Sequence, residues 1–308
     1  MRPAILIHGP TASGKTQLAI ELAKRLGGEI LNADAMQVYA DLDILSARPS
    51  AVELAEAPHH LFGHVDAAKR YSTGVWIKEA EARINALRAA DKVPILVGGT
   101  GLYLMALSEG LSDIPDIPEA ARIEARARVA RDALAAHADL VRVDPDLAAR
   151  VGPNDPQRMA RALEVWIAFG KPLSSFHGAS EPVLKAGDWL GVALTPPREA
   201  LYGRINQRVD DMVKMGAGDE ARRLWERRVP RDMPAMRAHG MPGFADHFEG
   251  RASLTEAVER CKRDTRRYAK RQFTWIAHQF TLWTRVPSEK LDVRARVIAA
   301  LWSEMQDA

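Results

Sequence analysis

The segment Gly9 to Thr16, GPTASGKT, constrains this chain most, because it matches the G-x-x-x-x-G-K-[ST] phosphate-binding loop in full. The apolar run Ala4–Ile7 before it is typical of a buried strand, and Gln17–Leu26 after it has helical spacing. A strand, a glycine loop and a helix N-terminus together direct backbone N–H groups and a positive dipole end toward an anion. The sequence therefore predicts a phosphate site formed by Gly9, Pro10, Thr11, Ala12, Ser13, Gly14, Lys15 and Thr16. Lys15 would reach the outer phosphates, and the Thr16 hydroxyl would help to hold Mg²⁺.

The length and composition indicate an ordinary globular protein. The chain has 308 residues and a formal net charge of +3, which suits one large or two modest domains. Cys261 is the only cysteine, so neither an intramolecular disulfide nor a multi-cysteine zinc site can form. The first apolar run is too short for a signal-peptide core, and no run reaches the roughly 18 residues that span a bilayer. We expect a cytoplasmic protein with no membrane partner.

The first third of the chain alternates strand-like and helical patterns. Buried strands are expected at 29–32 and 93–97, and Asp34 and Thr100 each follow one of them. Such alternation predicts βαβ units and a parallel sheet, in which ligands bind beyond the carboxyl ends of the strands. Asp34, Thr100 and the phosphate loop should therefore meet at one edge of the sheet.

The rest of the chain is predicted to be mostly helical. A segment with two prolines, Ser112–Pro118, is typical of a boundary, and helical patterns follow at 119–138, 144–151 and 156–169. A strand at 189–194 should return to the sheet, more helices are expected from Arg198 to about Gln279, and a short strand at 281–284 closes the pattern.

We thus predict an α/β fold with a P-loop NTPase-like parallel sheet core flanked by helices. Residues 1–114 would form the first part of the core, 115–186 a helical insertion, and 187–308 the remainder with a basic C-terminal helix.

Positive charge is concentrated near the C-terminus. Between Arg260 and Arg271, seven of twelve residues are Lys or Arg and only Asp264 is acidic. Aromatic residues interleave with this run, a combination found at nucleic-acid contacts, although an ordinary solvated helix face stays open as the alternative. Arg263, Arg267 and Arg271 have the spacing of one helical face and are our candidates for phosphate contacts. Further cations in the predicted insertion are Arg122, Arg126, Arg158 and Arg161.

Six further motifs follow the phosphate loop in a fixed order. They are DAMQVY (34–39), SARP (46–49), PHHL (58–61), PILVGGTGLY (94–103), PNDPQRMARALEV (153–165) and TRRYAKRQFTW (265–275). In order and spacing the chain resembles the bacterial tRNA dimethylallyltransferases (tRNA isopentenyltransferases) from the phosphate loop nearly to the C-terminus. The resemblance implies that the loop holds the diphosphate of dimethylallyl diphosphate, and that the acceptor is the adenosine on the 3′ side of the tRNA anticodon.

The resemblance also implies roles for individual residues. Asp34 stands where the family has its general base for adenine N6. Lys15, the loop amides and Mg²⁺ on Thr16 would stabilise the departing diphosphate, and Thr100 would belong to the catalytic group. An arginine of the RINQR stretch is implied as well; Arg204 and Arg208 are the candidates, and we favour Arg204.

The acceptor base must leave the stack of the anticodon loop to reach such a site. Residues that match the family's tRNA contacts are Asp34, Ala35, Met36, Gln37, Thr100, Arg122, Gln157, Arg158, Met159, Ala160 and Arg161. Thr100 has an alternative interpretation as a cap of the following helix. His59 and His60 have no third ligand at metal-binding spacing, so we interpret them as structural.

Two positions depart from the family pattern. Ala35 replaces the usual Ser after the catalytic Asp, and Gly240-Met241 replaces a Gly-Tyr pair. The first removes a hydroxyl near the reacting groups, and the second removes a ring. Neither lies in the phosphate loop, so we expect activity to survive.

Two other functions stay open from the sequence. The same loop serves ATP-dependent small-molecule kinases, but that function leaves DAMQVY, GGTGLY and the basic helix without a role. A non-catalytic RNA-binding protein with a structural nucleotide is the third possibility. We expect the chain to act as a monomer.

Overall fold

The computed structural model describes residues 2–112, 114–176, 181–286 and 289–307, which form two compact units. One unit comprises 1–108 with 183–308, and the other comprises 109–182. These limits lie a few residues before those predicted for the insertion, 115 and 186. Asp113 of the predicted boundary and residues 177–180 of the predicted insertion lie outside the described residues.

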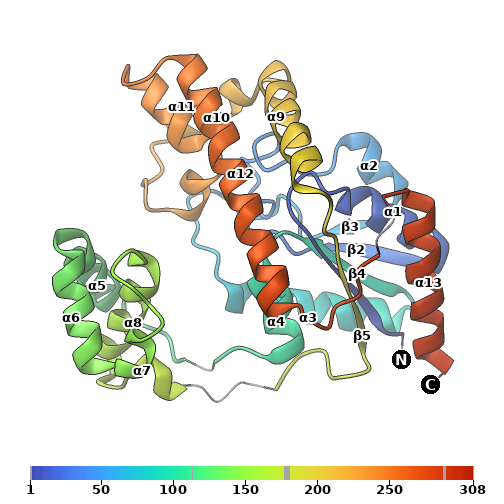
Figure 1. Ribbon diagram of the computed structural model, residues 1–308, viewed down its shortest axis with the longest axis horizontal. Coiled ribbons are helices and arrows are strands. Elements are labelled where there is room, and N and C mark those ends of the chain that lie inside the picture. Colours follow the sequence, from blue (N-terminus) through green and yellow to red (C-terminus); the bar gives the residue numbers. More distant parts are fainter. Residues whose placement is uncertain (1, 113, 177–180, 287–288, 308) are drawn as a thin grey trace. The chain divides into compact units, whose positions relative to one another are not determined.

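The larger unit is built on a five-stranded sheet in which every pairing is parallel, in the order β3-β2-β4-β1-β5 (Figure 1). The strands are β1 (Ala4–His8), β2 (Gly28–Asn32), β3 (His59–His60), β4 (Val93–Gly98) and β5 (Trp189–Ala193). Because β1 lies between β4 and β5, the loop that follows it emerges at the carboxyl edge beside the end of β4. This confirms the predicted α/β fold with a parallel sheet core. Of the strand expected at 281–284, only a single bridge from Thr284 to Val192 is present.

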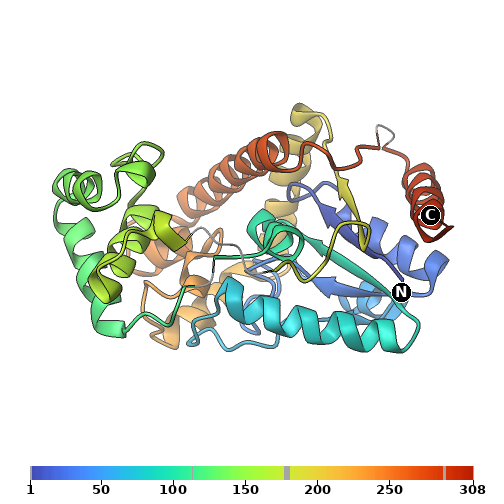
Figure 2. The same ribbon diagram turned by 90° about the horizontal axis from the view of Figure 1, so that it is seen from below.

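Alternate residues of β1 pack on opposite faces of the sheet, as the period of a strand requires. Ile5 and Ile7 join the helices α1 (Lys15–Leu26) and α13 (Leu291–Asp307) in one apolar cluster. Ala4 and Leu6 pack instead with α3 (Thr73–Ala89) and α4 (Gly101–Glu109). The last turns of α12 (Leu254–Gln279) lie beside α4 in both views (Figures 1 and 2).

A third apolar cluster lies beyond the carboxyl edge of the sheet. It joins the segment after β2 to the helices α9 (Arg198–Lys214), α10 (Ala217–Glu226) and α11 (Met241–Phe248). Two short elements, α2 (Ala51–Glu56) and the 3-10 helix Pro234–Arg237, complete the unit. The C-terminal region is therefore helical, as predicted from its sequence.

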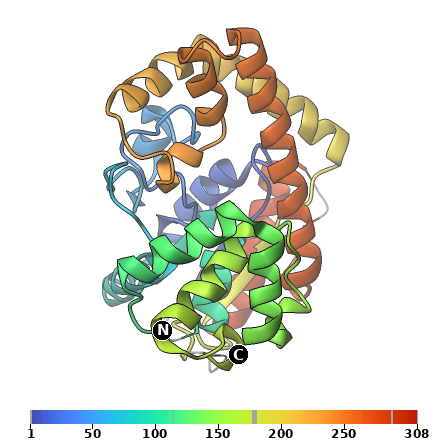
Figure 3. The ribbon, with the colours of Figure 1, turned by 90° about the vertical axis from the view of Figure 1, so that its left-hand side faces the viewer.

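The smaller unit consists of α5 (Glu119–Arg131), α6 (Ala133–Val143), α7 (Pro145–Ala148), α8 (Pro156–Phe169) and a 3-10 turn at Leu173–Phe176 (Figure 3, green). The single helical pattern expected at 119–138 is broken at Asp132, which adopts an extended conformation. Its carboxylate accepts hydrogen bonds from the N–H groups of Leu134 and Ala135. An N-cap of this kind begins a new helix, so Asp132 overrides the continuous alanine-rich pattern.

The helices of the described residues include none that combines the length and the apolar character needed to cross a membrane.

Candidate active site

The phosphate loop has the conformation that its glycines permit. Gly14 has a φ of 86°, a left-handed conformation that residues with a Cβ rarely adopt, and α1 begins directly after it at Lys15. A Cβ on Gly9 would lie 2.9 Å from both the Leu194 Cβ and the Ser13 Oγ. The loop therefore curls tightly over the end of β1 and presents the N-terminus of α1 to the space beyond the sheet.

Lys15 lies inside this curl. Its ammonium donates a hydrogen bond of 2.8 Å to the Pro10 carbonyl of the same loop. Burial lowers the pKa of Lys15 to about 8; the Asp34 carboxylate opposes this shift, and the Arg208 guanidinium adds to it. Burial also lowers the pKa of Arg208, with Glu53 and Asp34 acting against it. The site thus holds two desolvated cations, an arrangement that favours an anionic ligand.

The Asp34 corner follows β2 and is built by hydrogen bonds to the backbone. Asn32 is fully buried; its amide oxygen accepts from the Asp34 N–H at 2.8 Å, and its NH₂ group donates to the Asp34 and Leu61 carbonyls at 3.0 Å each. One Asp34 oxygen accepts from the Met36 N–H at 2.9 Å. These bonds fix the carboxylate at the end of the strand, where the sequence had placed it.

Thr100 joins this corner from the neighbouring strand end. Its hydroxyl accepts a hydrogen bond of 2.9 Å from the Ala35 N–H. The hydroxyl therefore bonds across the sheet edge to the segment that carries Asp34, a role that a cap of the following helix would not give it. The backbones of Gly98 and Ala33 approach each other closely, and only glycine fits there, because a Cβ on Gly98 would lie 2.0 Å from the Ala33 carbonyl oxygen.

Gln272 of α12 links the phosphate loop to the Asp34 corner, and sequence reasoning missed it. Its side-chain oxygen accepts from the Thr11 N–H at 3.2 Å, and its NH₂ group donates to the Gly99 carbonyl at 2.9 Å. The side chain is buried, and the two backbone groups belong to segments far apart in the chain. In the sequence Gln272 is one polar residue at the end of the basic run, and nothing there indicates its burial.

A cavity of about 500 Å³ opens at this edge of the sheet, within the larger unit. Its polar lining includes Lys15, Thr16, Asp34, Thr100 and Arg208. Its apolar lining includes Leu45, Ala47, Ile205, Val209, Met212 and Cys261. One cavity therefore combines an anion cradle, a carboxylate and an apolar wall.

The two arginines of the RINQR stretch have different surroundings. Arg208 lines the cavity. Arg204, which we favoured, has a 42% exposed side chain and donates to the Ala12 carbonyl of the phosphate loop at 3.1 Å. The geometry favours Arg208 as the residue that faces a bound ligand, because α9 turns that side chain inward and leaves Arg204 to support the loop.

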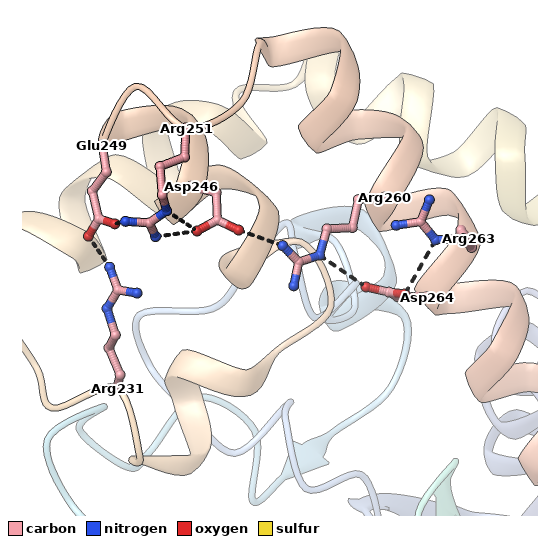
Figure 4. Close-up of polar contacts among 7 residues, drawn as sticks. All are labelled: Arg231, Asp246, Glu249, Arg251, Arg260, Arg263 and Asp264. Atoms are coloured by element: carbon pink, nitrogen blue, oxygen red, sulfur yellow. Dashed lines mark hydrogen bonds and ion pairs between the residues drawn. The ribbon is translucent and has the colours of Figure 1, made fainter.

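The basic residues of α12 divide into paired and outward-facing groups. Arg260 bonds to Asp246 of α11 at 2.6 Å and lies 3.6 Å from Asp264, as Figure 4 shows. Lys262 pairs with Asp210 at 2.8 Å and Arg266 with Asn206, which ties α12 to α9. These three cations therefore serve the packing of the helix.

Arg263 and Arg267 face outward with 51% and 67% exposed side chains, at 4.0 and 3.7 Å from Asp264. Figure 4 shows the Arg263 contact at the end of a chain of ion pairs that begins at Arg231. Arg271 lies over the Tyr268 ring at 5.4 Å and also lines the cavity. One exposed face of α12 thus carries cations as far as the mouth of the site.

In the smaller unit, the candidate tRNA contacts differ in exposure. Arg158 and Arg161 are 64% and 43% exposed and lie 3.5 and 3.6 Å from Asp155 and Glu164. Gln157 is exposed, whereas Met159 and Ala160 pack in the core of this unit. The exposed side chains available for RNA contacts in this stretch are therefore those of Gln157, Arg158 and Arg161. Arg122 is half-buried, and its Nε has no hydrogen-bond partner among the described residues.

The PHHL and SARP motifs support the site. His60 bonds to Glu29 at 2.6 Å and His59 to the Ala57 carbonyl at 2.7 Å, so both histidines have structural partners. The Ser46 hydroxyl bonds to the Leu42 carbonyl at 2.6 Å. His239 was not predicted; it lines the cavity with its ring 4.8 Å from that of Tyr268.

The oxygen donors in the cavity suit Mg²⁺. Thr16 at the start of α1 and the Asp34 carboxylate both line it. Magnesium binds through one or two such oxygens, substrate phosphates and water, and a site of this composition fits it.

The sheet order, the loop after β1 and the enclosed cations define a P-loop α/β protein with an anion site beside a carboxylate. Residues 37–279 match the family model described as IPP transferase. A tRNA dimethylallyltransferase of Hyphomonas neptunium is 54% identical over all of this chain and 98% of its own length. One from Maricaulis maris is 47% identical over 97% of both chains.

Solved structures agree with these matches. A full-length tRNA isopentenylpyrophosphate transferase from Bacillus halodurans aligns with a TM-score of 0.70 at 35% identity, over 100% of this chain and 99% of its own. A eukaryotic dimethylallyltransferase acting on tRNA aligns at 0.75 and 32% identity, over 90% of this chain and 70% of its own. The chain belongs to the tRNA dimethylallyltransferase (IPP transferase) family.

The depressed pKa of Lys15 predicts how anion affinity depends on pH. A diphosphate binds the protonated amine, so affinity for methyl diphosphate should be greatest near neutral pH and decrease as pH rises through about 8. An ordinary lysine would place this decrease about two units higher. Titration calorimetry from pH 6.5 to 9.5 measures it. Lys15→Arg keeps its charge over this range and should show no decrease in affinity. Lys15→Ala should bind weakly at every pH. A wild-type affinity that stays constant to pH 9.5 would contradict the prediction.

Proposed function

We propose that this protein transfers the dimethylallyl group of dimethylallyl diphosphate to N6 of the adenosine 3′ to the anticodon of tRNA and releases diphosphate. The observation that carries the proposal is that the phosphate loop and Asp34 line one cavity, which also has an apolar wall. Membership of the tRNA dimethylallyltransferase family supports it, as do the relatives of that name at about half identity over nearly the whole chain.

In the proposed reaction, N6 of adenine attacks C1 of the allylic diphosphate. The N6–C1 bond forms, the C1–O bond breaks, and its electron pair leaves with the diphosphate. Asp34 takes the proton that N6 loses, because its second oxygen is not engaged by the Met36 N–H. The hydrogen bonds from Asn32 to the Asp34 segment hold that carboxylate in place.

The negative charge that develops on the diphosphate would meet Lys15, Arg208 and the N-terminus of α1. Mg²⁺, when bound through Thr16, supplies further charge neutralisation for the leaving group. Lys15 must exchange its bond to the Pro10 carbonyl for one to phosphate when the ligand enters.

The acceptor would approach along the exposed cations of α12. Arg263 and Arg267 would contact phosphates, while Arg271 reaches both the helix surface and the cavity. The adenine must be flipped from the anticodon stack to reach Asp34, at a cost of roughly a few kcal/mol. Since its substrate would be tRNA, we place the enzyme in the cytoplasm, and we propose that it acts as a monomer.

Incubation with labelled substrate tests the proposal against phosphoryl transfer. Dimethylallyl diphosphate or ATP is supplied with and without tRNA, and label in tRNA and free phosphates are measured. We expect prenyl label in tRNA, one diphosphate released per product and no dependence on ATP. Stoichiometric phosphoryl transfer from ATP would contradict the proposal.

We predict that Asp34→Ala reduces turnover by about 10²-fold or more and leaves tRNA affinity within several-fold, the usual cost of losing a general base. Asp34→Asn is the sharper variant, since its oxygen can still accept from the Met36 N–H while the side chain has no basicity. Single-turnover rates at saturating tRNA measure both. Near wild-type chemistry in Asp34→Asn would remove this residue from the mechanism.

The second prediction concerns the outward face of α12. The triple variant Arg263→Gln, Arg267→Gln, Arg271→Gln should weaken tRNA binding and flatten its salt dependence. Each lost phosphate contact lowers the log–log slope by roughly 0.7–0.9. Methyl diphosphate binding should barely change in the double variant Arg263→Gln, Arg267→Gln, because these two side chains do not line the cavity.

Lys262→Gln provides the matched control on the same helix. Its side chain is 14% exposed and pairs with Asp210 and Glu259, so its loss should lower the melting temperature without altering the salt slope. If the triple variant behaved like this control, with lower stability and an unchanged slope, the outward face would not carry tRNA.

A further inference from the structure

The carboxylate of Glu220 on α10 is enclosed by backbone amides of a distant loop. One oxygen accepts from the N–H groups of Asp43 and Ile44 at 2.9 and 2.8 Å, and the other from Leu45 at 2.9 Å. The residue is only 4% exposed. Successive N–H groups directed at one point form an anion-binding nest, and charge-assisted bonds of this kind are stronger than neutral ones. Here the anion is the protein's own side chain.

The same loop is held at its other end by Gln37. The Gln37 NH₂ group donates to the carbonyls of Ser46 and Ala47 at 3.1 and 2.9 Å. Glu220 therefore binds the donors of residues 43–45, and Gln37 binds the acceptors of residues 46 and 47. Two side chains from outside the loop determine its position.

This loop forms part of the apolar wall of the cavity. Leu45 and Ala47 line it together with Val209 and Met212 of α9. Leu45 rests against Gly240, where a Cβ would lie 2.8 Å from its Cδ2. A diphosphate held at Lys15 leaves its hydrocarbon chain in the remaining volume, so the position of Leu45 limits how long that chain can be.

We propose that Glu220 is a positioning residue that sets this wall and thereby selects a five-carbon prenyl chain. The inference rests on the proposed function for its substrate, but the hydrogen bonds from the loop to Glu220 do not depend on that function. Glu220 touches no substrate. It acts through the amides of residues 43–45 on Leu45 and Ala47.

The test compares Glu220→Gln with Asp219→Asn. Glutamine keeps the size but brings an NH₂ group against amide donors, so at least one of the three bonds is lost. Asp219 is exposed on the same turn and loses the same charge, which makes it the matched control. Transfer to tRNA from dimethylallyl and geranyl diphosphates is measured for each variant, together with methyl diphosphate affinity.

For Glu220→Gln we expect KM for dimethylallyl diphosphate to rise about tenfold, with kcat within about threefold, the signature of lost uniform binding. The kcat/KM ratio of geranyl to dimethylallyl diphosphate should rise about fivefold or more. Methyl diphosphate affinity should not change, because this ligand has no chain to reach the wall. Asp219→Asn should match the wild type in all three.

Amide hydrogen exchange provides a readout that does not need activity. The amides of residues 43–45 should exchange faster in Glu220→Gln and at the wild-type rate in Asp219→Asn. Leu45→Ala enlarges the cavity at this wall and keeps the backbone N–H that bonds to Glu220. It should therefore also raise the kcat/KM ratio of geranyl to dimethylallyl diphosphate.

Unchanged exchange at residues 43–45 in folded Glu220→Gln would overturn the inference, and so would unchanged chain selection in both Glu220→Gln and Leu45→Ala. Equal losses for methyl diphosphate and dimethylallyl diphosphate would also overturn it, since they would indicate general damage to the site. Absence of prenyl transfer by the wild type would instead refute the proposed function, and the exchange result would still decide whether Glu220 holds the loop.

Discussion

The enclosed cations Lys15 and Arg208 are the constraint on which the rest of the site depends. Desolvation penalises both charges, and the nearby carboxylates compensate them only in part. In the structure Lys15 bonds to a carbonyl of its own loop, which partly compensates its desolvated charge. A cavity with this excess of positive charge favours a ligand with several negative charges, and the geometry of the phosphate loop suits a diphosphate.

Around these cations, the fold positions reactive groups through side-chain bonds to backbone atoms. Asn32 fixes the segment that carries Asp34, Thr100 bonds to Ala35, and Gln272 joins the phosphate loop to Gly99. Glu220 does the same for the loop at Leu45. Backbone groups in loops lack the partners that a helix or sheet would supply, and each of these side chains satisfies some of them. Side-chain bonds to the backbone therefore position both the polar and the apolar side of the cavity.

The helix α12 has two functions that its sequence presents together. Its basic run reads as one cluster, yet Arg260 and Lys262 neutralise acidic groups on neighbouring helices, whereas Arg263 and Arg267 face outward. Gln272 on the same helix reaches the phosphate loop. Charge density in a sequence thus overestimates the surface available to a polyanion, because part of it is used to pack the helix.

The sequence by itself determined the phosphate loop, the parallel sheet and the meeting of Asp34 with Thr100. These follow from local patterns, since strand ends in a parallel sheet share one edge. Helical periodicity predicted one helix over 119–138, but Asp132 caps a new helix and divides this segment into two. Only the tertiary structure decided that Arg208 rather than Arg204 lines the cavity, that Met159 is buried, and that Gln272 and Glu220 hold the loops. Glu220 and the amides it binds are about 175 residues apart, as in its bond to Leu45. Contacts over such separations leave no periodic signal, because they depend on how the elements pack and not on the order of neighbouring residues.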